Sequence, residues 1–196
     1  VIPTGRADFN NRGGFSTDYI GKNYEYPEGS YATRERIWKE HEEYQKGFYY
    51  FLATDPRVPK PLQDQMNQWG LAKDEFTDTG NWPHQLYIRE ARRMVGEYVA
   101  TQKDLQTDLM KSDAVGMGSY NSDSHNLQRF VNAKGFVENE GDVQVPVKPY
   151  QIAYRSLVPK RGEVENLFVP VCLSASHVAY SSMRMEPQYM LLGHAA

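Results

Sequence analysis

The chain has 196 residues, of which 40% are hydrophobic and 24% charged, a composition typical of a folded globular protein. Its 22 basic and 25 acidic side chains leave a net charge of -3, so it lacks the overall positive field that attracts nucleic acid or an anionic membrane. The sequence has no apolar run near the roughly 20 residues that a membrane-spanning helix needs. We therefore expect neither nucleic acid nor a membrane as a partner.

The single cysteine, Cys172, excludes a disulfide within the chain and any zinc cluster built from several cysteines. The first residues lack an initiator Met and the pattern of a signal peptide, and the last ten resemble a helix without a C-terminal cap. We expect the chain to be an internal piece of a longer polypeptide. The sequence does not indicate an oligomeric state or a compartment.

The N-terminal half is predicted to be mainly helical. Residues 1 to 30 are rich in Gly, Asn and Asp and predict loops. From Thr33 to about Asp55, apolar residues recur with helical spacing, which predicts an amphipathic helix. Leu62, Met66 and Trp69 predict a short second helix that ends near Gly70, and a surface loop follows.

The segment from Leu86 to Val99 carries two competing periodicities, and we favour a strand over a helix. Thr101 is expected to cap a helix from Gln102 to Lys111, with Asp104 placed favourably in its first turn. In the second half, short strands are predicted between turns, followed by a helix from Glu186 that has Pro in its first turn. The predicted strands cover 113–120, 136–137, 143–147, 150–154 and 166–172. The sequence thus predicts an α+β fold with a helical first half and a mainly β second half.

Alternating polar residues after the strand at 113–120 form the first candidate site. Asn121, Asp123 and His125 would project from one face if the strand continued, which would give one substrate an amide, a carboxylate and an imidazole. The alternative, which we favour from the residues alone, is a polar turn with local backbone hydrogen bonds. Three mixed donors at this spacing indicate a metal site only weakly, and we expect none.

A cluster of arginines at positions 89, 92 and 93 forms the second candidate. Guanidinium groups bind carboxylates through two parallel hydrogen bonds, so an anionic substrate or cofactor group could lie here. The alternative is that Glu90, Glu97 and aromatic rings pair with the arginines. The polar loop formed by Asp8, Asn10, Asn11 and Arg12 allows the same two interpretations.

The last forty residues form the third candidate. The predicted strand at 166–172 leads into a loop of small residues and then into the predicted helix at Glu186. Backbone N–H groups at a helix start carry partial positive charge and can face an anion or an electron-rich ring edge. The alternative is an ordinary connection from strand to helix whose small residues permit close packing.

Several segments together resemble a known family. The segment at 82–94 reads Trp-Pro-His-Gln-Leu-Tyr-Ile-Arg-Glu-Ala-Arg-Arg-Met, and the segment at 166–187 runs from Asn-Leu-Phe-Val-Pro to Met-Arg-Met-Glu-Pro. With the segments at 8–21, 120–125 and 154–160, they resemble the C-terminal part of bacterial FAD-dependent oxidoreductases, some of which are labelled xanthan lyase-like. The resemblance covers nearly the whole chain.

The resemblance implies a flavoprotein whose FAD is held mainly by an N-terminal βαβ unit with a Gly-x-Gly-x-x-Gly turn. Only Gly116-Met-Gly118 approaches that turn here. The resemblance therefore implies a substrate-side region at 1–160 and the end of an incomplete FAD-binding domain at 161–196, with weak or no FAD binding by this chain alone. It implies substrate-side catalytic roles for His125, Asn121 and Arg89, with His125 as the base. The implied cofactor-binding residues are Ser174, Ser176, His177, Ser182, Arg184 and Glu186.

The function expected from this resemblance is hydride transfer from an unknown small molecule or carbohydrate to FAD in the parent protein, with the fragment itself inactive. One alternative is a polysaccharide lyase, in which Tyr120, Asn121, His125 and nearby arginines neutralise a uronate and remove its α-proton. Another is a carbohydrate-binding module, because 14 Tyr and 3 Trp offer stacking surfaces. Most of these rings fall on helical stripes, which favours a core role.

Overall fold

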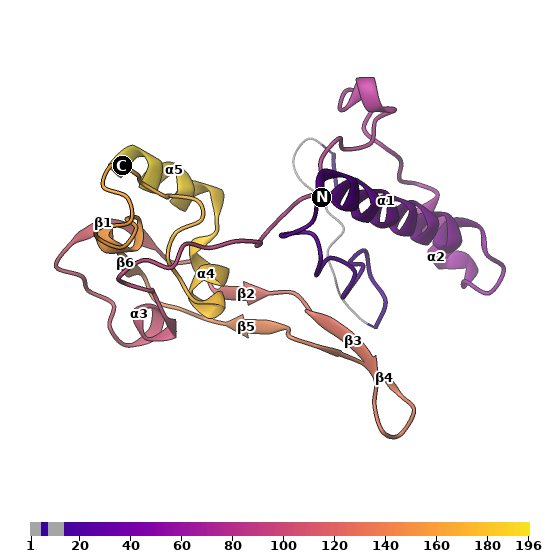
Figure 1. The fold of residues 1–196 in the computed structure, drawn as a ribbon. Helices are drawn as coiled ribbons and strands as arrows, with labels where there is room; N and C mark the ends of the chain where they lie inside the picture. The colour runs from indigo at the N-terminus through magenta and orange to yellow at the C-terminus, as the bar shows by residue number, and fades with distance from the viewer. Residues whose placement is uncertain (1–4, 8–13) are drawn as a thin grey trace. The chain divides into compact units, whose positions relative to one another are not determined.

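The computed structural model describes residues 5–7 and 14–196 and divides the chain into two compact units (Figure 1). Unit 1 comprises Val1–Ile88 and Gln128–Asn139, and unit 2 comprises Arg89–Leu127 and Glu140–Ala196. The predicted polar loop at Asp8–Arg12 lies outside the described residues. Within the part of the chain that is described, no helix is both long and apolar enough to cross a bilayer.

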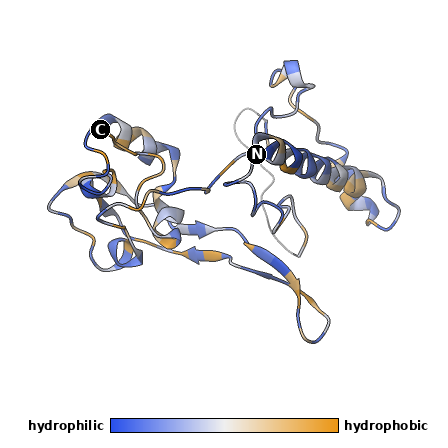
Figure 2. Cartoon of the chain, viewed as in Figure 1, coloured by the Kyte–Doolittle hydropathy of each residue, from blue (hydrophilic) through white to orange (hydrophobic). Residues whose placement is uncertain are grey.

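Unit 1 is organised around the long helix α1 (Tyr31–Thr54), which the apolar spacing predicted. The Ser30 hydroxyl caps its start by accepting a hydrogen bond from the backbone N–H of Thr33 at 3.2 Å. Only Ile37 and His41 of this helix are buried, and Figure 2 shows that much of its visible face is hydrophilic. The order of α1 therefore depends on capping and on exposed i,i+4 ion pairs as well as on packing.

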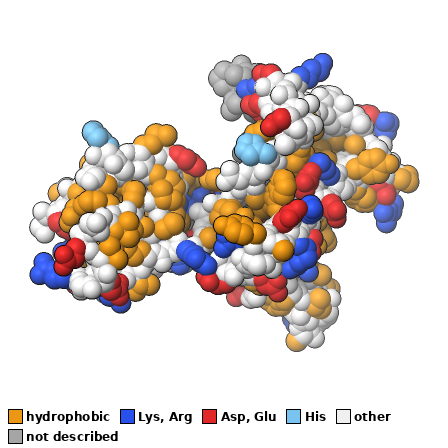
Figure 3. Space-filling view, turned by 45° about the horizontal axis from the view of Figure 1, so that its top comes forward, with side chains coloured by type: hydrophobic (Ala, Val, Ile, Leu, Met, Phe, Trp, Pro, Cys, Tyr) orange, Lys and Arg blue, Asp and Glu red, His pale blue; other side chains and the backbone are white. Residues whose placement is uncertain are grey.

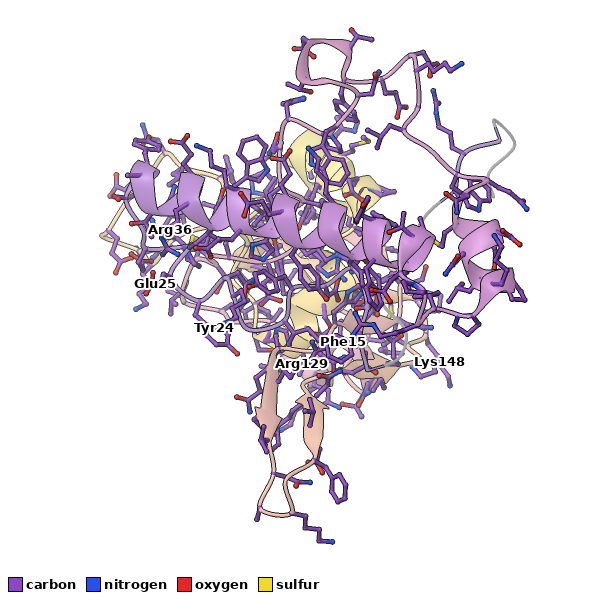
Figure 4. The ribbon with its side chains drawn as sticks, turned by 90° about the vertical axis from the view of Figure 1, so that its right-hand side faces the viewer. Phe15, Tyr24, Glu25, Arg36, Arg129 and Lys148 are labelled. Atoms are coloured by element: carbon purple, nitrogen blue, oxygen red, sulfur yellow. The ribbon has the colours of Figure 1, made fainter. Side chains whose placement is uncertain are left out.

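The remaining elements of unit 1 are short. Helix α2 (Lys60–Met66) begins two residues before the predicted start and ends at Met66, and the 3₁₀ helix η1 (Thr77–Thr79) follows in the loop. Strands β3 (Gln128–Val131) and β4 (Val137–Glu140) form a hairpin. Arg129 on β3 lies over the ring of Phe15 at 4.5 Å and donates a hydrogen bond to the Gly14 carbonyl, and Figure 4 labels both side chains. These contacts attach the hairpin to unit 1.

Unit 2 contains two further antiparallel pairs and the main hydrophobic core. Strand β1 (Ala114–Gly118) pairs with β6 (Tyr150–Ala153), and β2 (Ser122–Ser124) pairs with β5 (Val143–Val145). Its helical elements are α3 (Gln102–Gln106), η2 (Tyr154–Ser156), α4 (His177–Met183) and α5 (Glu186–Ala195). The fully buried side chains of this core include Leu105, Tyr150, Ile152, Leu157, Leu173, Met183 and Leu192.

The surface carries apolar and charged side chains together. The exposed large hydrophobic residues include Tyr31, which is 89% exposed, and Met190, which is 74% exposed. On the face drawn in Figure 3, orange apolar side chains are interspersed with charges of both signs. A mixed surface of this kind is ordinary for a folded protein.

The mixed α+β class is confirmed, with helix in the first half and strands later. The strand predicted at Leu86–Val99 is wrong, because this segment makes only isolated bonds with residues 172–176. The Met94 N–H donates to the Cys172 carbonyl at 2.8 Å, and the Gly96 N–H donates to the Ser174 hydroxyl instead of to a backbone carbonyl. A continuous ladder needs backbone partners at regular intervals, which are missing here.

The strand predicted at 166–172 is also wrong. The Val169 N–H donates to the Leu157 carbonyl at 2.8 Å, but Pro170 has no N–H with which to continue a ladder. The helix predicted at 102–111 ends at Gln106, and the chain beyond it bonds to β6 through Leu109 and Lys111.

The helix predicted from Glu186 is confirmed as α5, whereas α4 occupies residues that the sequence analysis described as a loop. The sequence-based division at residue 160 concerns substrate-side and cofactor-side roles and stays a prediction. The compact units have different boundaries.

Candidate functional site

The candidate site in unit 2 is built around the start of α4. Residues 94–100 run beside residues 172–176 and are joined to them by a parallel bridge between Ala100 and Ala175. The Ser176 hydroxyl then caps α4 by accepting a hydrogen bond from the Ala179 N–H at 3.3 Å. This bridge and cap fix the position of His177, the first residue of α4.

His177 is bonded to Glu90 from the segment that precedes the bridge. Nδ1 of His177 lies 2.8 Å from Oε2 of Glu90, and Oε1 of Glu90 pairs with the guanidinium of Arg93. The Arg93 Nε donates to the Ala175 carbonyl at 2.9 Å, so both partners of Glu90 are attached to the loop before α4. The opposite ring atom, Nε2 of His177, is buried and has no hydrogen-bond partner among the described residues.

The electrostatics of this site favour a neutral imidazole. Burial lowers the pKa of His177, and the positive charges of Arg93 and Arg184 lower it further. Because Glu90 also pairs with Arg93, its negative charge is largely compensated and does not reverse this direction. A neutral ring that donates from Nδ1 presents Nε2 as a hydrogen-bond acceptor. His177 is therefore oriented to accept a proton or a hydrogen bond.

The structure brings together two of the predicted substrate-side residues. Nη1 of Arg89 lies 2.5 Å from Nε2 of His125. Arginine only donates, so Nε2 of His125 is the acceptor in this contact. The third predicted residue, Asn121, accepts a hydrogen bond through Oδ1 from the Val147 N–H at 3.2 Å. The pattern did not predict the pairing of Arg89 with His125, which are 36 positions apart.

Asp123 lies on β2 in a network of polar side chains. Its carboxylate accepts hydrogen bonds from the Tyr120 hydroxyl at 2.9 Å and from the Gln144 amide, and Nη2 of Arg184 lies 3.6 Å from Oδ2. Burial alone would raise the pKa of Asp123, but these hydrogen bonds and the charge of Arg184 hold it below its ordinary value. Asp123 is therefore ionised at neutral pH and compensates the charge of Arg184.

Three of the predicted cofactor-binding residues are buried and bonded to the protein itself. The Ser174 hydroxyl accepts from the Gly96 N–H at 3.0 Å, and the Ser182 hydroxyl lies 2.7 Å from the Tyr150 hydroxyl. Nη2 of Arg184 donates to the Asp123 carbonyl at 2.8 Å. Of the others, Ser176 caps α4 and Glu186 lies in the first turn of α5. The ring atom Nε2 of His177 is the one buried side-chain atom among these six described residues that lacks a hydrogen-bond partner.

The described residues do not form a complete FAD site. A dinucleotide site needs parallel strands joined through a glycine-rich turn to a helix N-terminus. The described strands pair antiparallel or as a hairpin, and parallel pairing is limited to the isolated bridge at Ala100. Gly116 and Gly118 lie within β1, where the side chains of Leu191 and Tyr150 approach them closely, so they cannot hold a pyrophosphate.

Comparison with known sequences identifies the family. The sequence model of the FAD dependent oxidoreductase family matches residues 1–196. The chain belongs to this family. No curated protein and no solved structure matched the chain. The family-level resemblance is thus confirmed, and it supports a flavin-dependent oxidoreductase function and FAD as the cofactor that the family uses.

From its position in the sequence, Glu90 is expected only to pair with the arginines, and the structure adds His177 to its contacts. No local spacing could have connected residues 90 and 177, which are 87 positions apart. The cap at Ser176, by contrast, had a sequence signal, because Ser is a preferred N-cap residue.

Within the described part of the chain, no group of three or more His, Cys, Asp or Glu side chains could hold a metal ion.

Proposed function

We propose that this chain is part of a flavin-dependent oxidoreductase that transfers a hydride from an unidentified substrate to FAD, and that the chain alone is inactive. Two findings support the proposal: the family match extends over all 196 residues, and the described residues offer no cradle for the pyrophosphate. When bound, FAD supplies the hydride acceptor. A bacterial origin and the xanthan lyase-like label remain expectations from the resemblance.

The observation that carries the proposal is the Glu90–His177 pair. Oxidation of an alcohol or amine removes a hydride from carbon and a proton from oxygen or nitrogen, so the protein must supply a proton acceptor. Nε2 of His177 is buried and unpartnered, and its ring is held by the Glu90 carboxylate at 2.8 Å. We assign it the role of accepting the substrate proton. Glu90 would hold the ring in the tautomer that presents Nε2 as the acceptor.

The pair Arg89 and His125 is proposed for the substrate side. Its guanidinium and imidazole groups can bind an anionic or hydroxyl group when a substrate separates the 2.5 Å contact between them. His125 also remains a candidate base, although its Nε2 accepts from Arg89 in the structure. Asn121 stays a proposed substrate contact. The buried residues Ser174, Ser182 and Arg184 would act by holding the loop before α4 and the helices after it in place.

The geometry supports the polysaccharide lyase alternative less well. A Tyr base in such a reaction needs a lowered pKa. Burial and the hydrogen bond to Asp123 instead raise the pKa of Tyr120. The Tyr120 hydroxyl already donates to Asp123 at 2.9 Å.

The test uses the flavin-loaded protein that contains this chain, in the wild-type form and as the His177→Ala, His125→Ala and Glu90→Gln variants. A panel of alcohols, hydroxy acids and amines is screened for anaerobic bleaching of the flavin band, and the rate is then followed by stopped flow. We expect His177→Ala to slow bleaching by roughly 10²–10⁴-fold with normal flavin content.

His194→Ala is the matched control, because this exposed histidine lies on α5 of the same unit. Its rate should equal that of the wild type. A normal rate in His177→Ala with a slow rate in His125→Ala would assign the base to His125. Binding of FAD by the 196-residue chain alone at micromolar or lower concentration, measured by flavin fluorescence, would contradict the proposal that the chain lacks the pyrophosphate site.

A further inference from the structure

Unit 1 contains a large pocket that the flavin chemistry does not explain. It has a volume of about 1220 Å³ and lies beside the C-terminal half of α1, the end of α2 and the loop through residues 67–83. This exceeds the roughly 300–1,000 Å³ of pockets that hold drug-sized ligands. The pocket therefore has room for a ligand larger than a single small metabolite.

Aromatic rings from several segments line this pocket. They are Tyr49, Tyr50, Trp69, Phe76 and Trp82. Tyr50 is 72% exposed and Trp69 is 39% exposed. Tyr49, Phe76 and Trp82 are half-buried. Aromatic rings concentrated in one pocket, two of them exposed, favour stacking against a flat ligand that has an apolar face and polar edges.

The charged groups at the pocket are paired within the protein. Nη2 of Arg6 lies 2.8 Å from Oδ2 of Asp74, and Nη1 lies 3.3 Å from Oε1 of Glu75. Lys46 pairs with Glu42, and its Nζ lies 4.8 Å from the centre of the Trp82 ring. Because these cations have acidic partners, a phosphate or carboxylate ligand would have to compete with them. The pairing favours a neutral ligand.

Two side-chain amides add hydrogen-bonding capacity to the lining. The Asn81 amide donates to the Glu75 carbonyl at 2.9 Å, and the Asn67 amide donates to the Gln63 carbonyl at 2.8 Å. Each amide group is thereby oriented, which leaves its Oδ1 atom as an acceptor for ligand hydroxyls. Hydroxyl groups are suitable ligands for such fixed acceptors because each can both donate and accept.

The loop that carries two of the lining residues has an unusual backbone. Phe76 has φ = 49° and Asn81 has φ = 63°, and these are the two non-glycine residues with positive φ in the described part of the chain. The Asn81 N–H donates to the Phe76 carbonyl at 2.8 Å, which holds this conformation. Strained residues of this kind cluster at ligand sites, where the surrounding structure fixes them.

From the aromatic lining, the oriented amides and the internally paired charges, we propose that this pocket binds a neutral oligosaccharide. Pyranose rings with equatorial hydroxyls present apolar C–H faces to aromatic rings and hydroxyls to amides at their edges. A chain of several sugar units suits the volume of the pocket. This binding function is separate from the proposed redox function in unit 2.

The test is calorimetric titration of the chain with cellotetraose, xylotetraose and mannotetraose, with tetragalacturonate as the anionic comparison. We expect saturable binding of at least one neutral tetrasaccharide and weaker binding of the uronate. Trp82→Ala and Tyr50→Ala should each weaken binding by about tenfold, as expected for loss of one stacking surface. Tyr50 is exposed, so its replacement should leave the fold intact.

Tyr31→Ala is the matched control, because Tyr31 is 89% exposed on α1 but does not line the pocket. Its affinity should equal that of the wild type. Failure of all three neutral tetrasaccharides to bind at millimolar concentration would overturn the proposal. Binding that Tyr50→Ala and Trp82→Ala leave unchanged, or stronger binding of tetragalacturonate, would also overturn it.

Discussion

Gly118 lies directly opposite Tyr150 in the β1–β6 pair, and the tyrosine ring covers the glycine. A Cβ atom added at position 118 would lie 2.5 Å from the Tyr150 hydroxyl oxygen. Tyr150 is fully buried, so it cannot move aside. We therefore expect Gly118→Ala to lower the free energy of unfolding by about 1–3 kcal/mol, as overpacked cores do. Chemical denaturation measures this change.

Gly116→Ala on the same strand is the matched comparison. A Cβ atom there would lie 2.6 Å from Cδ2 of Leu191, but Leu191 is 38% exposed and can change rotamer. We expect a smaller loss of stability than for Gly118→Ala. Equal losses would mean that the Tyr150 ring is not as firmly held as its burial implies.

The Tyr150 hydroxyl should make stability depend on pH in alkaline solution. Burial raises the pKa of Tyr150 to about 12, and the hydrogen bond with Ser182 offsets this only in part. The unfolded chain has a tyrosine pKa of about 10, so the folded state holds the proton more tightly. The stabilisation of the folded state by this protonated hydroxyl is complete below pH 10 and is lost as pH rises toward 12.

Tyr150→Phe should therefore reduce the slope of stability against pH between about 10 and 12, and it should cost about 1 kcal/mol at pH 8. Denaturation series at pH 8, 10 and 11 provide the measurement. Ser122→Ala, which removes a different buried hydroxyl of unit 2, is the control that should leave the slope unchanged. A Tyr150→Phe slope identical to that of the wild type would contradict the prediction.

Lys111 and Asp104 form an ion pair within unit 2, with 3.0 Å between Nζ and Oδ1 and side-chain exposures of 2% and 7%. Lys111→Met would leave the Asp104 carboxylate buried without its cation. Breaking one partner of a buried pair typically costs about 3–5 kcal/mol. We expect a loss of this size on denaturation, and Lys103→Met, at an exposed position of α3, should cost little.

The same pair should support stability in acid. Burial would raise the pKa of Asp104, but hydrogen bonds from Tyr98, Thr101 and Lys111 hold it below its ordinary value. The ionised Asp104 carboxylate therefore stabilises the folded state above the unfolded pKa of about 3.9, and this stabilisation is lost as pH falls below that value. The slope of stability against pH in this range should be shallower in Lys111→Met than in Lys103→Met. Equal slopes would contradict this account of the pair.

Local signals in the sequence predicted the elements that depend on local chemistry. The apolar spacing in α1, the cap at Thr101 and the Pro of α5 indicated three helices that the structure contains, although α3 ends at Gln106 instead of Lys111. The strand predictions at 86–99 and 166–172 failed because periodicity does not reveal hydrogen-bond partners. The first segment bonds to the Ser174 hydroxyl and the Cys172 carbonyl, and the second bonds to the Leu157 carbonyl through Val169. Strand pairing depends on distant partners, whereas capping does not.

The candidate site was predictable in its residue types and not in its pairings. His177, His125 and Arg89 were all singled out, but Glu90 was expected to serve only the arginines. Contacts across 87 and 36 positions join Glu90 to His177 and Arg89 to His125. Arg184 was expected to bind the cofactor. In the structure, Nη2 of Arg184 lies 3.6 Å from the Asp123 carboxylate, 61 positions away in the sequence.

The proton-accepting role of His177 is the central claim, and long-range ¹H–¹⁵N NMR spectra of the histidine rings in the 196-residue chain test it most directly. The spectra report which ring nitrogen carries the proton as pH changes. We expect His177 to carry its proton on Nδ1, with a pKa below the ordinary histidine value, because burial and Arg93 disfavour the charged ring while Glu90 orients it. The Glu90→Gln variant should lose the preference for one tautomer, and His194, which is exposed on α5, serves as the internal reference. A His177 ring protonated on Nε2, or charged at neutral pH, would contradict the account.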